Sequence, residues 1–303
     1  MKRLLLTLTA ISAAMILQAQ DGKPPIPQSF GQSPSPSEAA VTLRAGDAIM
    51  VVDPAKGGKI LSLKYKGQEV ISQSRWPESF GSTFWTSPQK EWNWPPVPEF
   101  DKHAYNVLEQ ADNRLVISSP VSQRLGLSVG KNFSTDEADG AFVVTYSIKN
   151  EGKEERRVAP WEVTRVQNGN GLIFFAPTDS IWPAGLMNFE TGDGAAWYHT
   201  DEAPQNRKVN ADGRGWLAYC ADGLLLVKRF QDLQPGQPAP GEAEVQVYVN
   251  RGKTHIELES QGAYTLLPPG ESLSWTVRWY LQPVDKDMPR ERLMERVNNI
   301  VNR

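Results

Sequence analysis

Residues 254–261 could do chemistry, because one histidine and two glutamates alternate along this segment. In an extended strand, alternate side chains point to the same side, so His255, Glu257 and Glu259 would share one face. An imidazole and two carboxylates aligned in this way could bind a divalent cation or act as general acid and base. The alternative is a polar strand that faces solvent.

A second segment, residues 75–101, is rich in tryptophan and proline and shows no steady hydrophobic period, which predicts a long loop region. Its aromatic and polar residues include Trp76, Trp85, Trp92 and Trp94, together with Arg75, Lys90, Glu91 and Asn93. Indoles stack on the C–H faces of a pyranose, while charged and amide groups hydrogen-bond its hydroxyls. We therefore predict that a sugar cleft is lined by Trp85, Lys90, Trp92 and Trp94. The alternative is that these indoles only cap one end of the fold.

A third segment, residues 161–165, reads Trp-Glu-Val-Thr-Arg. In a strand, Trp161 and Arg165 would share one face and Glu162 would lie on the other. Glu162 and Arg165 could be ordinary surface charges, but we place both on the floor of the predicted cleft with Glu259. The lone cysteine, Cys220, follows an apolar run and is expected to be a buried, unreactive thiol.

The elements that must position these residues are mostly β-strands, because alternation with a period of two recurs along the chain. It is clearest at residues 142–148, 243–249 and 272–281. Further strands are expected at 48–53, 58–65, 104–109, 114–119, 157–166, 172–176, 194–199 and 215–230, separated by glycine-containing turns. Only residues 289–302 have helical spacing. The pattern predicts an all-β protein, one large twisted β-sandwich over residues 41–303 with a short C-terminal helix.

Composition excludes several classes of function. The formal net charge of −3 gives no polybasic surface for nucleic acid. One cysteine and three histidines are too few for a cysteine-rich or histidine-rich metal centre, and the sequence contains no nucleotide-binding motif. We therefore predict no metal, no cofactor and no nucleic-acid partner. We expect the protein to be a monomer.

The N-terminal residues are expected to lie outside the fold. Residues 1–19 combine a basic start with an apolar run of the length typical of a cleaved signal peptide. That run is shorter than the roughly 20 residues a membrane-spanning helix needs, so we predict no membrane span in the mature form. Residues 20–40 are rich in proline and serine and predict a linker. The expected location is the periplasm or the exterior of the cell.

Several short motifs, taken in order, resemble the galactose mutarotase-like superfamily, whose members include aldose 1-epimerases. The motifs are the opening hairpin at 57–71, the segment 80–89, Phe-Asp-Lys at 100–102, Leu-Glu-Ser-Gln at 258–261 and Leu-Pro-Pro-Gly-Glu at 267–271. The resemblance is closest to secreted mutarotase-like domains of carbohydrate-degrading bacteria. It implies a β-supersandwich with a sugar cleft on its concave face, and it implies that Glu259 is the base that abstracts the anomeric proton.

The sequence also departs from that family. The resemblance implies one histidine near Trp94 and another near Trp161 and Glu162, but neither position holds a histidine. In the family those histidines protonate the ring oxygen and orient the sugar. The favoured hypothesis is therefore an exported protein that binds a mono- or oligosaccharide without the standard mutarotase activity. The alternatives are an active aldose 1-epimerase with Glu259 as base and His103 or Lys90 as acid, or a structural module of a polysaccharide-processing assembly.

Overall fold

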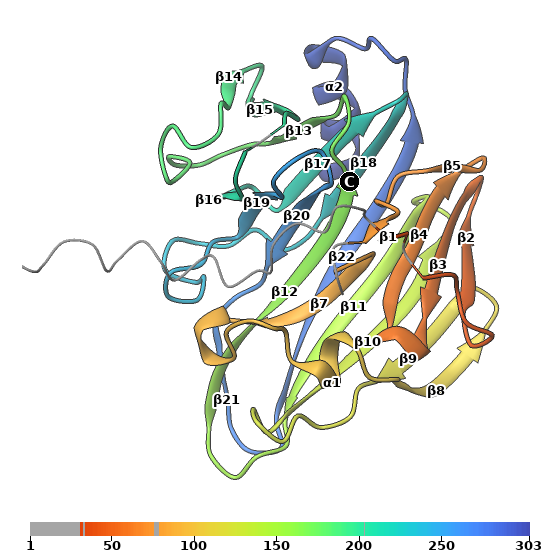
Figure 1. The fold of residues 1–303 in the computed structure, drawn as a ribbon, viewed down its shortest axis with the longest axis vertical. Helices are drawn as coiled ribbons and strands as arrows, with labels where there is room; N and C mark the ends of the chain where they lie inside the picture. The colour runs from red at the N-terminus through yellow and green to blue at the C-terminus, as the bar shows by residue number, and fades with distance from the viewer. Residues whose placement is uncertain (1–30, 33, 76–78, 203) are drawn as a thin grey trace, which may run out of the picture.

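The computed structural model describes residues 31–32, 34–75, 79–202 and 204–303, and its main body is a pair of antiparallel β-sheets (Figure 1). The predicted signal peptide (1–19) and much of the predicted linker (20–40) lie outside the described residues. A small separate pairing joins β1 (Gly31–Gln32) to β6 (Ser74–Arg75). In the part of the chain that is described, no helix has the length and apolar character needed to cross a bilayer.

Sheet I, which carries the candidate site, has eight strands on its main path and two short strands beside it. In spatial order these are β16 (Arg207–Ala211), β19 (Val245–Val249), β20 (His255–Gln261), β12 (Arg156–Gln167), β7 (Ser82–Ser87), β4 (Lys59–Tyr65), β3 (Ala48–Asp53) and β2 (Val41–Ala45); β21 (Thr265–Leu267) pairs with β12 and β5 (Gln68–Glu69) pairs with β4. All of these pairings are antiparallel. The sheet therefore places β20 and β7, which are far apart in sequence, on either side of β12.

Sheet II packs against sheet I and is a continuous antiparallel sheet of ten strands. In spatial order these are β14 (Glu190–Gly192), β15 (Ala195–His199), β13 (Leu172–Phe175), β17 (Trp216–Ala221), β18 (Leu224–Arg229), β22 (Ser272–Pro283), β11 (Ala141–Asn150), β10 (Leu127–Asp136), β9 (Arg114–Ser118) and β8 (Asn106–Ala111). The predicted strand 215–230 is a hairpin of β17 and β18, because Asp222 and Gly223 both adopt positive φ and turn the chain.

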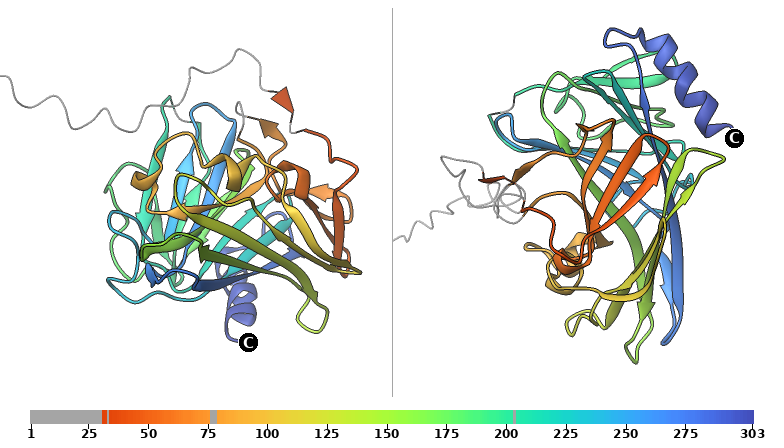
Figure 2. Two further views of the ribbon diagram at one scale, coloured as in Figure 1. Left: turned by 90° about the horizontal axis from the view of Figure 1, so that it is seen from below. Right: turned by 90° about the vertical axis from the view of Figure 1, so that its right-hand side faces the viewer.

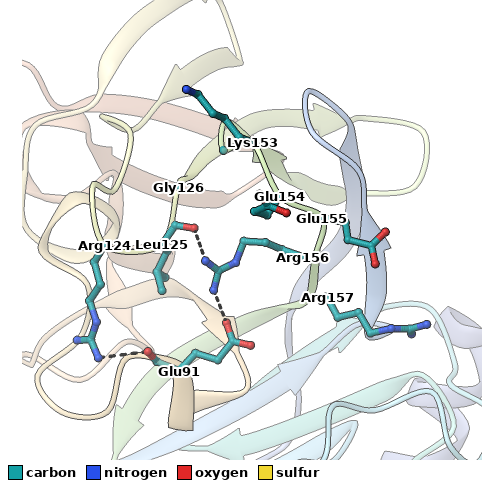
Figure 3. A pocket seen from close by; sticks show the side chains of 10 residues that line it. Glu91, Arg124, Leu125, Gly126, Lys153, Glu154, Glu155, Arg156 and Arg157 are labelled. Atoms are coloured by element: carbon teal, nitrogen blue, oxygen red, sulfur yellow. Dashed lines mark hydrogen bonds and ion pairs between the residues drawn. The ribbon is translucent and has the colours of Figure 1, made fainter.

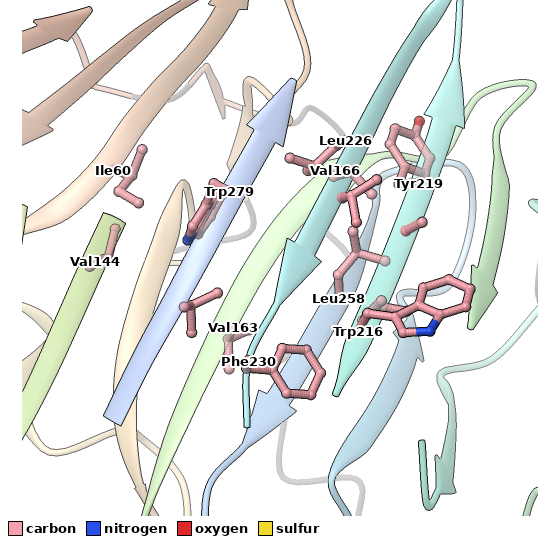
Figure 4. Close-up of a cluster of buried hydrophobic side chains, with 14 of the residues drawn as sticks. Ile60, Val144, Val163, Val166, Trp216, Tyr219, Leu226, Phe230, Leu258 and Trp279 are labelled. Atoms are coloured by element: carbon pink, nitrogen blue, oxygen red, sulfur yellow. The ribbon is translucent and has the colours of Figure 1, made fainter. Parts of the chain in front are cut away.

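Side chains from alternate positions of both sheets fill the space between them (Figure 4). Leu258 and Val166 of sheet I lie in the same buried cluster as Leu226 and Trp279 of sheet II. Burying one such side chain contributes about 1.5–3 kcal/mol, so this layer is the main source of stability. The predicted all-β sandwich is confirmed.

Helical segments are short except at the C-terminus. They are η1 (Pro54–Lys56), η2 (Gln89–Glu91), α1 (Pro98–Asp101) and α2 (Arg290–Val301). Leu293, Val297 and Ile300 are buried along one stripe of α2, which confirms the predicted C-terminal helix. Arg290 at its start lies over the ring of Trp197 in β15, so α2 packs beside the end of sheet II (Figure 2).

One element was predicted wrongly. Residues 75–101 were expected to form a long loop, but Ser82–Ser87 form β7 in the middle of sheet I, hydrogen-bonded to β12. Every residue of β7 is buried. A strand covered on both faces shows no alternation of polar and apolar residues, so the period that identifies other strands is missing here.

Candidate functional site

The register between β12 and β20 determines which side chains meet on sheet I. Glu259 lies opposite Val163, Glu257 opposite Arg165 and Gln261 opposite Trp161. Directly opposed residues in an antiparallel pair point to the same side of the sheet. Their sequence neighbours point toward sheet II, so these six residues point away from it. We call this side of sheet I the polar face; it also carries Lys208 and Asn210 of β16, Gln246 and Tyr248 of β19, His255 of β20, and Thr83 and Trp85 of β7.

Glu259 is held in place by two donors from neighbouring strands. The indole Nε1 of Trp161 and the Nζ of Lys208 both donate to its Oε2, each at 2.8 Å. The Lys208 Nζ also lies 4.6 Å from the centre of the Trp161 ring. Within the described chain, Oε1 of Glu259 accepts no hydrogen bond, so that oxygen keeps an open acceptor position.

The charge state of Glu259 reflects opposing effects. Burial raises the pKa of its carboxyl above the usual range, because water no longer solvates the charged form. Lys208 and the Trp161 indole oppose that rise, whereas the nearby carboxylate of Glu257 adds to it. The net result is a raised pKa, with burial as its largest cause.

Four tryptophans form a cluster beside Glu259. The ring of Trp85 lies 5.2 Å from Trp161, 5.7 Å from Trp92 and 6.2 Å from Trp94, each edge to face. Trp161, Trp85 and Trp92 are buried, with exposures of 1%, 4% and 1%, whereas Trp94 is only partly buried. Trp161 thus joins the tryptophan-rich segment to Glu259, and Trp94 is the least buried member of the cluster.

The orientation of Trp85 is fixed by Asp101. The buried Asp101 carboxylate accepts hydrogen bonds from Trp85 Nε1 at 2.9 Å and from Thr83 Oγ1 at 2.8 Å. Lys59 Nζ lies 3.1 Å from its other oxygen. Burial alone would raise the pKa of Asp101, but Lys59 and these donors bring it below the usual range. The Asp101 carboxylate therefore anchors the indole cluster through Trp85.

Arg165 and Glu257 form the other charged pair of the polar face. The Nη2 and Nε of Arg165 lie 2.9 and 3.0 Å from Oε1 of Glu257, and its Nη1 donates to the carbonyl of Phe80 at 3.2 Å. The Nε2 of His255 lies 3.6 Å from the same Glu257 oxygen. All three side chains are buried, so the alternative of a solvent-facing strand is wrong. Among the described residues, no group of three or more His, Cys, Asp or Glu side chains is arranged to hold a metal ion.

Glu162 does not share this face, although it was placed on the cleft floor. Its side chain points between the sheets, where it pairs with Lys228 of β18. Ser82 Oγ donates to Glu162 Oε1 at 2.6 Å, and Ser260 Oγ donates to Oε2 at 3.4 Å. The reason is the strand period, which turns Glu162 away from its neighbours Trp161 and Val163.

The remaining predicted residues are not joined to this cluster by the contacts of the described chain. Lys90 is exposed on η2, and His103, the proposed alternative acid, is exposed after α1. Cys220 is half-buried rather than fully buried, and burial raises the pKa of its thiol to about 11, which keeps it unreactive as expected. Trp76 lies outside the described residues, as does the side chain of Arg75.

A hollow of about 420 Å³ lies beside η2 and the start of β12 (Figure 3). Two of its three guanidinium groups, those of Arg156 and Arg124, already bind the protein. Arg156 donates to the Leu125 carbonyl at 2.8 Å and to Glu91 Oε2 at 3.0 Å, and Arg124 donates to the Trp92 carbonyl at 2.7 Å. This hollow therefore serves to fix the loop that carries Trp92 and Trp94.

Sequence reasoning missed Lys208, which supplies the ion pair of Glu259. Residues 207–211 are a short strand at the margin of sheet I, with Lys208 and Asn210 on one side and Val209 and Ala211 on the other. That alternation is a weak strand signal that could have identified a polar side. Nothing in the local sequence indicates that this strand would lie two strands away from β20.

Comparisons with known proteins identify the fold. No family model matches the chain, and no curated protein matches its sequence. Solved structures do match. A putative aldose 1-epimerase from Escherichia coli K12 has 14% identity and a TM-score of 0.56, over 81% of this chain and 99% of that one. A galactose mutarotase-like protein from Lactobacillus casei ATCC 334 has 10% identity and a TM-score of 0.58, over 80% of this chain and 100% of that one. A TPR-domain containing protein from Parabacteroides distasonis has 13% identity and a TM-score of 0.56, over 83% of this chain and 49% of that one.

Proposed function

Proceeding from the galactose mutarotase-like fold of this chain, we propose that the protein binds a saccharide on the polar face of sheet I, around Glu259 and Trp94, and lacks the standard mutarotase reaction. The fold likeness supports a carbohydrate-binding or epimerase-like protein. The finer choice rests on the side chains around Glu259.

The observation that carries the proposal is the arrangement at Glu259. One oxygen of a buried carboxylate is held by Trp161 and Lys208, which leaves the other oxygen to accept a hydroxyl. A tryptophan cluster whose least buried member is Trp94 adjoins it. A fixed acceptor beside an aromatic platform is the combination that orients a pyranose ring.

Loss of the standard reaction follows from the missing acid. Ring opening of an aldose needs a proton donor at the ring oxygen as well as a base at the anomeric hydroxyl. The indole N–H of Trp161 can donate a hydrogen bond but is not a useful acid, and it is already bound to Glu259. Lys208 is bound to the same oxygen, so it does not stand across a sugar from the base.

A second candidate function, an active aldose 1-epimerase, is favoured by one observation. Burial raises the pKa of Glu259, and a general base works best when its pKa approaches the working pH. Under this alternative Glu259 takes the anomeric proton and a group other than a family histidine supplies the acid.

Binding and activity assays on one set of proteins decide between these functions. Calorimetry against common aldoses should detect millimolar or tighter binding that Glu259→Gln weakens and Glu109→Gln, on the exposed strand β8, leaves unchanged. Polarimetry of fresh α-anomers should show no rate above the buffer. A wild-type rate that Glu259→Gln abolishes would establish the epimerase instead. Absence of binding to every sugar tested would refute both functions.

We also propose that the protein acts outside the cytoplasm, on the basis of its basic and apolar N-terminal residues. The expected mature chain begins near residue 20. Expression of the full chain, followed by cell fractionation and intact-mass measurement, tests this. Recovery of the uncleaved chain in the cytoplasm alone would contradict it.

A further inference from the structure

A second hollow, of about 590 Å³, lies at the margin of sheet I beyond β16 and β19. Trp182 lines it with 42% of its surface exposed, in contrast to the buried indoles near Glu259. Polar side chains line it as well, among them Asp212, Arg214 and Glu242. An accessible indole in a concavity offers a flat apolar face on which a sugar ring can stack.

The strand register connects this hollow to the polar face. Trp182 forms a two-way backbone bridge with Asn210, with N···O distances of 3.0 and 2.8 Å. Asn210 lies opposite Gln246, and Gln246 lies opposite Glu259. Opposed residues point to the same side, so Trp182 and Glu259 lie in one cross-strand row on the same face. Three strand spacings separate them, about 15 Å, which is longer than one pyranose ring.

A chain of amide side chains fills the row between the two ends. Gln246 Nε2 donates to Asn210 Oδ1 at 2.7 Å and to Glu242 Oε2 at 3.0 Å. Gln261 Nε2 donates to the same Glu242 oxygen at 3.2 Å. The Oε1 of Gln261 is buried, yet it has no hydrogen-bond donor within the described residues. A buried acceptor without a donor costs free energy unless a ligand or water supplies one.

We propose that the saccharide site extends along this row from Glu259 to Trp182, and that its ligand is an oligosaccharide whose outer end is neutral or amino-substituted. This inference rests on the proposed function and names its substrate class. The inner sugar meets Glu259, the unsatisfied Oε1 of Gln261 accepts a hydroxyl of a middle unit, and the outer unit stacks on Trp182.

The charge of the hollow sets the chemistry of that outer unit. Its lining carries five carboxylates and one guanidinium: Asp179, Asp212, Asp232, Glu242 and Glu244 against Arg214. Burial is the main cause that raises the pKa of Glu244 to about 7, and the nearby carboxylates of Asp232 and Asp212 add a smaller rise. A uronic acid or sulfated unit would be repelled here, whereas a neutral or protonated amino sugar would not.

Titration with saccharides of increasing length tests the extension. The probes are cello-, xylo-, manno- and chitosan oligosaccharides of one to six units, with galacturonic acid oligomers of the same lengths. The affinity of at least one neutral or amino series should rise about tenfold or more between one and four units. Trp182→Ala should remove that gain while keeping the affinity for the single unit, and Trp182→Phe should retain most of it. Leu108→Ala, at a side chain 66% exposed on β8 of sheet II, is the matched control and should change nothing.

The outcomes separate this inference from the function on which it rests. Binding of single sugars that depends on Glu259, without any gain from length, would overturn the extension and leave the proposed function standing. A gain from length that survives Trp182→Ala would do the same. Tightest binding of galacturonic acid oligomers through Trp182 would refute the charge argument. Failure of every probe to bind would refute the proposed function as well.

Discussion

The two faces of strands β12 and β20 each carry a glutamate paired with a lysine, and the two pairs differ in what surrounds them. Between the sheets, Glu162 and Lys228 are both fully buried, with no exposed side-chain surface. On the polar face, Glu259 is 1% exposed but its partner Lys208 is 22% exposed. The same two residue types, a few ångströms apart through one sheet, therefore have different access to water.

Their hydrogen bonds differ in the same way. Both oxygens of Glu162 are occupied, since Ser82 and Thr164 donate to one and Ser260 donates to the other. Glu259 has both its donors on one oxygen, and the other oxygen is left without one by the described residues. A pair whose acceptors are all satisfied can only hold the sheets together. A pair with one open acceptor can also bind a ligand.

The largest expected effect is a loss of folding stability when the buried pair of Glu162 and Lys228 is broken. Lys228→Met leaves Glu162 as a buried charge without its cation, and such losses cost about 3–5 kcal/mol. Lys208→Met should cost less, because Lys208 is partly solvated and the Trp161 indole still donates to Glu259. Urea unfolding at neutral pH measures both. Equal losses in the two variants would show that the pairs do not differ as the burial indicates.

A double variant separates the effect of the buried charge from the loss of packing by the Lys228 side chain. Glu162→Gln combined with Lys228→Met removes both charges, so it should be more stable than Lys228→Met alone. No recovery in the double variant would mean that the lysine stem, rather than its charge, supports the core.

The next effect concerns Glu244, which is fully buried like Glu162 but accepts its hydrogen bonds from backbone groups. Its oxygens accept the backbone N–H groups of Gly215 at 2.9 Å and Leu233 at 2.7 Å, and its pKa is raised from 4.5 to about 7. Between these two pH values the folded state binds more protons than the unfolded state. Stability should therefore fall as the pH rises through this window, by at most about 3 kcal/mol.

Unfolding measured from pH 4.5 to 8 in the wild type and in Glu244→Gln isolates this contribution. The stability of the wild type relative to the variant should decrease across the window, because glutamine does not titrate. The absolute stability of the variant also reflects one lost backbone hydrogen bond, so the slope is the quantity to compare. A difference that does not change with pH would contradict the assignment.

The sequence could predict a strand or helix when its pattern of polar and apolar residues lies within that one element. The alternation at 142–148 predicted β11, and the spacing of Leu293, Val297 and Ile300 predicted α2, because each pattern lies within one element with one buried side. Strand β7 was missed because both of its faces are buried. Alternation along the sequence cannot identify a strand when the surroundings of both its faces are equally buried.

The candidate site shows the same limit. Alternation placed His255, Glu257 and Glu259 together, since they share one strand. It could not show that Lys208 would reach Glu259, because that contact depends on how β16, β19 and β20 are ordered in the sheet. Glu162 was assigned to the cleft although its own alternation with Trp161 indicated the opposite side. Contacts between distant strands depend on the order of the strands in the sheet. That order results from the packing of the whole core, so no short segment of sequence reveals it.

A third prediction compares the same substitution, glutamate to glutamine, at Glu259 and at Glu162. Glu259→Gln should lower saccharide affinity about tenfold, because a hydrogen bond to a charged acceptor is lost, while changing stability little. Glu162→Gln should do the reverse: it lowers stability and, at a temperature where the variant is folded, leaves affinity unchanged. Calorimetry gives the saccharide affinity of each variant, and urea unfolding gives the free energy of unfolding of each. An affinity loss in Glu162→Gln as large as that in Glu259→Gln would show that the two faces are not functionally separate.

The smallest effect is expected from Trp161→Phe, which keeps a ring in the tryptophan cluster but removes the N–H that donates to Glu259. That hydrogen bond lowers the pKa of Glu259, so its loss should raise the pKa further. If binding needs the charged carboxylate, the pH at which half of the affinity is lost on acidification should move upward, with only a few-fold loss at pH 8. Calorimetric titrations at several pH values measure this shift. A uniform loss of affinity at every pH would mean that Trp161 acts through packing rather than through its hydrogen bond, and Lys208 would then be the main group that sets the charge of Glu259.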